Sequence, residues 1–297
     1  MLKSISLLLV ALATIPSVKV VANQTSQNEC DNHYYDENQN ECADKVAYTL
    51  YRTQEQVYEH EKSLRGGKID NVRTDFGCVI AQNIGQNTLN ARYNKIHTNL
   101  RVSDTCTEIA VTMAAKFYLD AKYRNTDVEI NELEIYEKVM DYARTKHYWQ
   151  GDRGTEYNTG RYMLQHVLEE YDIISSHWNN YTNMYFGVKD FVESPNYGTL
   201  GKVQLFGVQN HVMLAVGYYL IEYDYKVSHQ FLWSKWETNE HANKMYIVVC
   251  DGFRCGKPAS KELVELERFY RYFELGTCEK YINGIDIPEA NYLGEKE

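Results

Sequence analysis

Apolar residues in the first half of the chain recur at helical spacing. Ile109, Met113 and Phe117 follow one another every four residues, with alanines beside them, and form one apolar stripe. The polar residues 103–105 come just before this stripe, where helix-capping side chains are expected. The pattern therefore predicts a helix that begins near Thr107.

Weaker patterns of the same kind lie on both sides of this helix. They favour further helices over residues 46–64, 130–144, 160–170 and 184–192. Gly66 and Gly67 are expected to end the first of these, and a short extended piece is expected over residues 96–100. Helices thus dominate the first half of the chain.

After Gly201 the pattern changes to extended runs rich in Val, Leu and Tyr. These runs predict strands over residues 203–208, 211–225, 245–250 and 263–273. The polar segment 233–243 is interpreted as a hairpin loop or an insertion. Helices first and antiparallel strands afterwards predict an α+β fold, in which an N-terminal helical half packs against a C-terminal antiparallel sheet.

Size and charge narrow the classes of protein to which the chain can belong. With 297 residues, 44% of them hydrophobic, it can bury a core as one large domain or two smaller ones. Its formal charge of -10, without any run of Lys or Arg, argues against nucleic acid or an anionic lipid as a partner. Either partner would need a basic patch that displaces counterions.

The N-terminus has the pattern of a secretory signal. Lys3 precedes an apolar run over residues 5–15, and small residues such as Ala22 follow. An uncleaved anchor is the alternative, but the run is shorter than the roughly 20 residues that span a bilayer. We therefore expect a signal peptide over residues 1–22, a secreted protein that starts near Asn23, and no membrane span after cleavage.

The chain has seven cysteines, so in an oxidising compartment at least one thiol stays unpaired. Local bridges are plausible between Cys30 and Cys42 and between Cys250 and Cys255. A metal site built from Cys250, Cys255 and Cys278 is the competing interpretation. Its spacing matches no zinc knuckle and no His-Glu-x-x-His motif occurs, so we expect neither a metal nor another cofactor.

Cys106 lies at the start of the strongest predicted helix, a position that suits a nucleophilic thiol. A thiolate is stabilised by the unpaired N–H groups of a helix N-terminus and by a neighbouring imidazolium. His211 begins the long predicted strand and can accept the thiol proton, and Asp251 follows a later strand, where it can orient the imidazole. Each residue alone is more often structural, but together they suggest a Cys-His-Asp triad.

Segments around these three residues resemble the papain-like cysteine peptidases. Residues 104–118 are similar to the helix that carries the nucleophile, nearest to the bacteriocin-processing branch and related bacterial cysteine peptidases. Residues 210–218 resemble the histidine strand of that superfamily, and residues 246–253 resemble the strand that delivers its Asn or Asp. Residues 201–207 resemble the strand before the histidine.

The resemblance implies a papain-like catalytic domain over residues 96–297. Residues 23–95 would then be an N-terminal extension or subdomain, with a removable pro-segment as one possibility. The implied substrate is a polypeptide, and the implied reaction is hydrolysis of a peptide bond through an acyl-thioester on Cys106. His211 would transfer the protons and Asp251 would hold the tautomer of the imidazole.

One feature departs from the family. A Gln a few residues before the nucleophile normally donates to the oxyanion, and no Gln lies between Asn87 and Cys106. Asn99 is the nearest amide that can replace it, with the backbone N–H of Cys106 as the second donor. The loss of one oxyanion donor typically raises the barrier by about 2.7 to 4 kcal/mol, so this departure matters for activity.

Two other functions stay open. Transglutaminase-like or amidase chemistry also uses Cys, His and Asp in this order and passes through the same acyl-enzyme. A catalytically inactive secreted module, with 26 tyrosines and an acidic charge that serve a partner, is the non-enzymatic alternative. The oligomeric state is not indicated by the sequence.

Overall fold

The computed structural model of the chain describes residues 50–51, 53–151, 154–180, 183–194, 201–208, 211–252, 270–275 and 280–287. The predicted signal peptide over residues 1–22 lies outside these ranges, as does the polar segment that follows it up to residue 49. The first part of the predicted strand 263–273, up to residue 269, also lies outside them.

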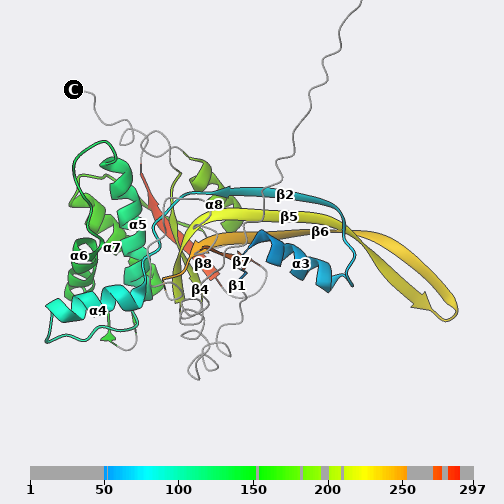
Figure 1. The fold of residues 1–297 in the computed structure, drawn as a ribbon, viewed down its shortest axis with the longest axis horizontal. Coiled ribbons are helices and arrows are strands. Elements are labelled where there is room, and N and C mark those ends of the chain that lie inside the picture. The colour runs from blue at the N-terminus through cyan, green and yellow to red at the C-terminus, as the bar shows by residue number, and fades with distance from the viewer. Residues whose placement is uncertain are drawn as a thin grey trace, which may run out of the picture.

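The helices α4 to α7 gather on one side of the molecule (Figure 1). The predicted central helix is α5, and its residues from Thr107 to Leu119 are all buried because α6, α7 and the sheet surround it. The helices are α3 (Gln54–Leu64), α4 (Gln86–Ile96), α5 (Cys106–Lys122), α6 (Glu132–Thr145), α7 (Gly160–Glu169) and α8 (Met184–Glu193), with a 3-10 turn η2 (Tyr157–Thr159) before α7.

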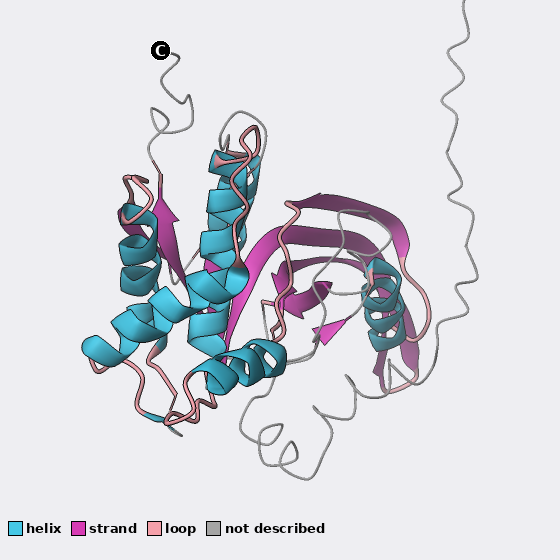
Figure 2. Cartoon of the chain, turned by 60° about the vertical axis from the view of Figure 1, so that its left-hand side comes forward, coloured by secondary structure: helices cyan, strands magenta, loops and turns pink. Residues whose placement is uncertain are grey.

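The described strands form one antiparallel sheet, drawn in magenta in Figure 2. They are β1 (Leu50–Tyr51), β2 (Asp70–Cys78), β3 (Ser176–Asn180), β4 (Gln204–Val208), β5 (His211–Phe231), β6 (Ser234–Cys250), β7 (Tyr270–Glu274) and β8 (Lys280–Asp286). Their order is β1-β7-β6-β5-β4-β8-β3, with β2 paired to β5. β4 pairs with the start of β5 and β2 with its middle, so these two strands follow each other along one edge of β5.

Both faces of the sheet are covered at the end where β5 begins. Side chains of a strand alternate between the two faces, so Val212 and Leu214 pack toward α5 while Met213 and Ala215 pack toward α8. This end of β5 is therefore buried throughout, which explains its nearly continuous apolar sequence. The α+β class predicted from the sequence is confirmed.

Two predicted elements differ from the structure. Ile96 ends α4 and the residues after it form a turn, so the extended piece over residues 96–100 is wrong. The segment 233–243 lies largely in β6, because only Leu232 and Trp233 form the turn that joins it to β5. Cross-strand backbone hydrogen bonds hold this polar segment as a strand, although its composition is typical of a loop.

The residues expected to form an N-terminal extension contribute to the same sheet and core. β2 pairs with β5 from Asp70↔Asp224 to Cys78↔Gly217, and α4 packs against α6. A side chain at Gly217 would come within 2.5 Å of the Gly77 carbonyl oxygen, so this close pairing requires glycine. Removal of residues 23–95 would take β2 and α4 out of the fold; whether it occurs stays a prediction.

Candidate active site

The helix α5 begins at Cys106, and the residue before it does not cap the helix. The Thr105 side chain makes no capping bond; its Oγ1 instead donates to Asn90 Oδ1 on α4 at 2.9 Å. The first-turn N–H groups of α5 are therefore not engaged by the usual capping side chain. They present a partial positive charge beside the Cys106 sulfur.

His211 and Asp251 come together at the ends of two adjacent strands. His211 is the first residue of β5, and Asp251 follows the last residue of β6. His211 Nε2 lies 3.0 Å from Asp251 Oδ1, and both side chains are buried. The carboxylate therefore fixes the orientation of the imidazole, because a buried ring with one nitrogen held has little freedom to rotate.

The imidazole also contacts the sulfur. Burial lowers the pKa of His211, but the charge and hydrogen bond of Asp251, together with a hydrogen bond and charge interaction with Cys106, raise it well above 6.5. Because Nε2 is held by Asp251, Nδ1 is the ring nitrogen left for Cys106 Sγ. The structure thus brings together the three residues that the sequence singled out, on α5, β5 and β6.

Cys106 is a free, partly buried thiol. Cys78 is also free, so the odd number of cysteines does not by itself single out Cys106. Burial raises the pKa of Cys78 to about 12, and its Sγ donates to the Val79 carbonyl oxygen at 3.3 Å. Cys78 is therefore held as a neutral thiol. The expected bridges Cys30–Cys42 and Cys250–Cys255 each include residues outside the described ranges.

A buried amide that sequence reasoning missed lies next to the triad. Gln86 begins α4, and its backbone N–H donates to the carbonyl oxygen of Gly252, the residue after Asp251, at 2.9 Å. One helical turn later, Asn90 contacts Thr105, the residue before Cys106. Gln86 thus lies on a face of α4 that contacts two segments, the one that follows Asp251 and the one that precedes Cys106.

The Gln86 side chain is buried, with one amide atom unpaired in the part of the chain that the structure describes. It is almost fully buried, and its Oε1 has no hydrogen-bond partner among the described residues. Asn83, in the segment before α4, is also buried, and neither of its amide atoms has a partner there. Buried polar atoms are normally paired, so these unpaired amide atoms favour a site that water or a bound ligand completes.

Asn99, the oxyanion donor expected from the sequence, lies in the exposed turn after α4. It makes no hydrogen bond within the described part of the chain, and no contact joins it to Cys106. Its role stays a prediction. The spacing rule that pointed to Asn99 assumes that the donor lies shortly before the nucleophile, whereas the fold brings Gln86 to the site from twenty residues earlier in the chain.

A buried carboxyl group lies in the first turn of α5, close in the chain to Cys106. Glu108, in the first turn of α5, is fully buried, and Thr155 Oγ1 donates to its Oε1. Burial raises the pKa of Glu108 to about 7, although the hydrogen bond from Thr155 acts in the opposite direction. Its Oε2 has no hydrogen-bond partner among the described residues. Glu108 therefore changes protonation near neutral pH, two residues from Cys106.

The loop that carries Thr155 packs tightly against the segment before Cys106. Trp149 Nε1 donates to the Ser103 carbonyl oxygen, and Trp149 forms a β-bridge with Thr155. Gly154 has a φ of 66°, and a side chain there would come within 3.1 Å of the Asp104 carbonyl oxygen. This position therefore requires glycine for both its backbone angle and its close approach.

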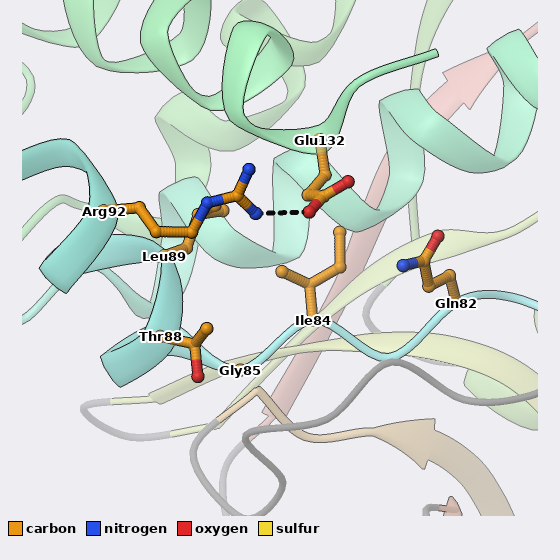
Figure 3. Close-up of a pocket in the computed structure, with 7 residues that line it drawn as sticks. All are labelled: Gln82, Ile84, Gly85, Thr88, Leu89, Arg92 and Glu132. Atoms are coloured by element: carbon orange, nitrogen blue, oxygen red, sulfur yellow. Dashed lines mark hydrogen bonds and ion pairs between the residues drawn. The ribbon is translucent and has the colours of Figure 1, made fainter. Parts of the chain in front are cut away.

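A shallow cavity between α4 and α6 does not belong to the triad. It is bridged by the ion pair between Arg92 and Glu132, and Gln82, Ile84 and Thr88 also line it (Figure 3). The ion pair ties α4 to the start of α6. Cys106, His211 and Asp251 are not among the residues that line this cavity.

Comparison with known protein families and with curated protein sequences finds no match to the chain. Within the described ranges, no group of His, Cys, Asp and Glu has the arrangement of a metal site. No helix in those ranges has the length and apolar character needed to cross a membrane.

Proposed function

We propose that the protein is a cysteine peptidase with a papain-like arrangement, in which Cys106 is the nucleophile, His211 the acid and base, and Asp251 the orienting carboxylate. The observation that supports this most strongly is the buried contact of 3.0 Å between His211 Nε2 and Asp251 Oδ1, on an imidazole that also contacts Cys106. A base held by a third group beside a free thiol is the arrangement that activates sulfur.

The reaction begins from a thiolate on Cys106 and an imidazolium on His211. Sγ attacks the carbonyl carbon of the peptide bond, and the carbonyl electron pair moves onto oxygen. As the C–N bond breaks, His211 gives its proton to the leaving amine, and an acyl-thioester remains. The neutral His211 then takes a proton from water, whose oxygen attacks the thioester; the C–S bond breaks and the thiolate and imidazolium are restored.

Two donors stabilise the oxyanion in this proposal. The backbone N–H of Cys106, at the uncapped start of α5, is the first. Gln86 is favoured over Asn99 as the second, because it is buried and attached to Gly252 next to Asp251, whereas Asn99 is exposed. Donors that are already fixed before the reaction stabilise developing charge without reorganisation.

The proposed substrate is a polypeptide, and the proposed site of action is outside the cell. The N-terminal pattern of a charged residue, a short apolar run and small residues supports secretion. An acidic surface is compatible with a peptide substrate that carries no strong negative charge.

The test is proteolysis of casein and of a mixture of fluorogenic peptides by the parent protein and by Cys106→Ala. We expect the parent to cleave and the variant to lose activity by a factor on the order of 10⁶, whereas the matched control Cys78→Ala stays active. Cleavage that survives Cys106→Ala contradicts the proposal. A labelled amine added to the assay distinguishes hydrolysis from acyl transfer. Label incorporated into the substrate in place of cleavage identifies an acyl transferase.

A further inference from the structure

The hairpin formed by β5 and β6 extends well beyond the body of the protein (Figure 1). β2 covers one edge of β5 only as far as Asp224. From Tyr225↔Glu240 to Phe231↔Ser234 the two strands pair with each other and with no other strand that the structure describes. At about 3.3 Å per residue, this projecting part is about 20 Å long.

The projecting hairpin has one aromatic face and one polar face. Directly opposed residues share a face, so Tyr225, Val227, His229, Phe231 and Trp236 lie on one side, together with the polar residues Ser234, Thr238 and Glu240. His229 and Trp236 stack there with ring centroids 5.4 Å apart. The other face carries only polar residues, namely Lys226, Ser228, Gln230, Lys235, Glu237 and Asn239. This alternation is typical of a sheet that buries one face.

The helix α3 covers this face near the body of the protein but not near the tip. Tyr223 and Tyr246 donate to the buried Glu61 at 2.6 Å each, and Arg65, just after α3, lies over the Tyr225 ring at 4.0 Å from its centroid. Beyond this point Phe231 is 68% exposed. The apolar face therefore continues past the element that covers it.

The turn at the tip has unusual residues. Two-residue hairpin turns need a positive φ at the first central residue or at both, and therefore favour Gly or Asn there. Here Leu232 and Trp233 occupy the turn, Leu232 with a φ of 54°, and they are 64% and 93% exposed. Local turn preference and water exposure both disfavour these residues, so their presence calls for a partner that buries them.

The charge near the tip differs in sign from that of the whole chain. No Asp or Glu occurs between Lys226 and Trp236, whereas the chain as a whole has a formal charge of -10. Lys226 lies 3.7 Å from Glu237, an exposed pair, and Lys235 is next to the turn on the polar face. The overall charge argues against an anionic partner, and the projecting part 225–240 is formally neutral, but its outermost residues 227–236 carry Lys235 and no carboxylate, because Glu237 and Glu240 lie further from the turn.

We infer that the tip of the β5–β6 hairpin inserts into the interfacial region of an anionic lipid bilayer, with Leu232, Trp233 and Phe231 among the acyl chains and Lys235 at the headgroups. The insertion is peripheral, not a span. Tryptophan and lysine prefer the membrane interface. The tip is convex, so a bilayer, which has no fixed shape, can surround it. A second copy laid against the aromatic face would cover Phe231 but leave the turn exposed.

The test is cosedimentation of the full chain with vesicles of equimolar phosphatidylcholine and phosphatidylserine, with tryptophan quenching by brominated lipid as a second readout. We expect the parent to bind. The double variant Leu232→Gly with Trp233→Asn should bind at least about tenfold more weakly, because it removes the inserted surface. Leu232 has a positive φ and Trp233 does not, so Gly-Asn suits the turn and this variant should unfold at the same or a higher temperature than the parent.

Two further variants complete the test. Lys235→Gln should weaken binding to the anionic vesicles about fivefold, because one basic residue near an anionic surface strengthens binding by about that much. Any binding to pure phosphatidylcholine should stay unchanged. The matched control Ile174→Asn with Phe186→Ser, which changes exposed apolar residues elsewhere, should bind like the parent. The inference is overturned if the parent does not bind vesicles, if the Gly-Asn variant binds equally well, or if the tip only mediates self-association in solution.

Discussion

Thr105 and Asn90 form a hydrogen bond that replaces a helix cap. Thr105 Oγ1 donates to Asn90 Oδ1 at 2.9 Å, although Thr105 stands at the position from which a hydroxyl normally caps the helix. The same Asn90 oxygen accepts from the Tyr136 hydroxyl of α6. This one amide therefore connects α4, α6 and the start of α5, and the N–H groups beside Cys106 stay available.

Substitution of Asn90 tests this connection. Asn90→Leu leaves two buried hydroxyl groups without an acceptor, and we expect the free energy of unfolding to fall by about 2 to 4 kcal/mol. Chemical denaturation measures it. The exposed neighbour Asn87→Leu serves as the matched control and should change stability little. Equal stability of the two variants would show that the bond to Asn90 does not stabilise the fold.

Glu108 predicts a dependence of stability on pH. Its pKa is about 7 in the folded chain against an ordinary value of 4.5, so the folded state holds a proton that the unfolded state releases. Stability therefore falls as the pH rises from about 4.5 to about 7, by about 3 kcal/mol in all.

Glu108→Gln removes the ionisable group and should flatten this dependence in denaturation curves recorded across that range. Above pH 7 we expect the variant to be more stable than the parent. Glu169→Gln, at an exposed position, is the control and should leave the curve unchanged. A parent protein whose stability rises between pH 4.5 and 7 would contradict the account of Glu108.

The imidazole of His211 should stay protonated well above pH 6.5, because Asp251 and Cys106 raise its pKa. The stabilisation that comes from this raised pKa is complete below pH 6.5 and is lost as the pH rises through the folded value. Titration followed by nitrogen-15 NMR of the ring measures it directly. Asp251→Asn should lower the pKa, whereas Asp224→Asn, far along the hairpin, should not. A ring that titrates at its ordinary pH in the parent rules out the proposed ion pair.

The oxyanion donor can be assigned by a matched pair of variants. Gln86→Ala should lower kcat by about 10² to 10³ with little change in KM, since the donor acts on charge that develops in the transition state. Asn99→Ala should leave kcat unchanged. The opposite pattern would restore the assignment made from the sequence.

The triad could be predicted from the sequence because each residue marks the end of a strongly patterned element. Cys106 starts the longest described helix, which is buried from Thr107 to Leu119, and His211 and Asp251 border strands of continuous apolar residues. The pairing of β5 with β6 then places the last two side by side. The hydrophobic patterns of these elements reflect burial alone, so they can be recognised in the sequence without knowledge of which residues they contact.

The helix α4 could not be found in the same way. Its buried stripe consists of Gln86, Leu89, Asn90 and Tyr93, which have helical spacing but include two amides. Hydrophobicity alone therefore does not reveal the stripe. The Asn90 side chain accepts a hydrogen bond from Thr105, and the Gln86 backbone N–H donates to Gly252, so this face of α4 is buried against residues that are distant in the sequence. The missed oxyanion candidate belongs to this group for the same reason.

The outer strands and the hairpin depend on tertiary pairing. β3 and β8 are rich in polar residues and pair with each other from Ser176↔Asp286 to Asn180↔Ile282. Strand preference depends strongly on neighbours, so such segments have no reliable local signal. The polar half of β6 also lacks a local strand signal, so its sequence predicts a loop.

The central claim is that His211 activates Cys106, and the rate of alkylation by iodoacetamide at neutral pH tests it most directly. The account predicts that Cys106 reacts about a hundredfold faster than Cys78, as peptide mapping by mass spectrometry would record, and that His211→Ala removes most of this advantage. Slow labelling of Cys106 in the parent, or fast labelling that survives His211→Ala, would contradict it.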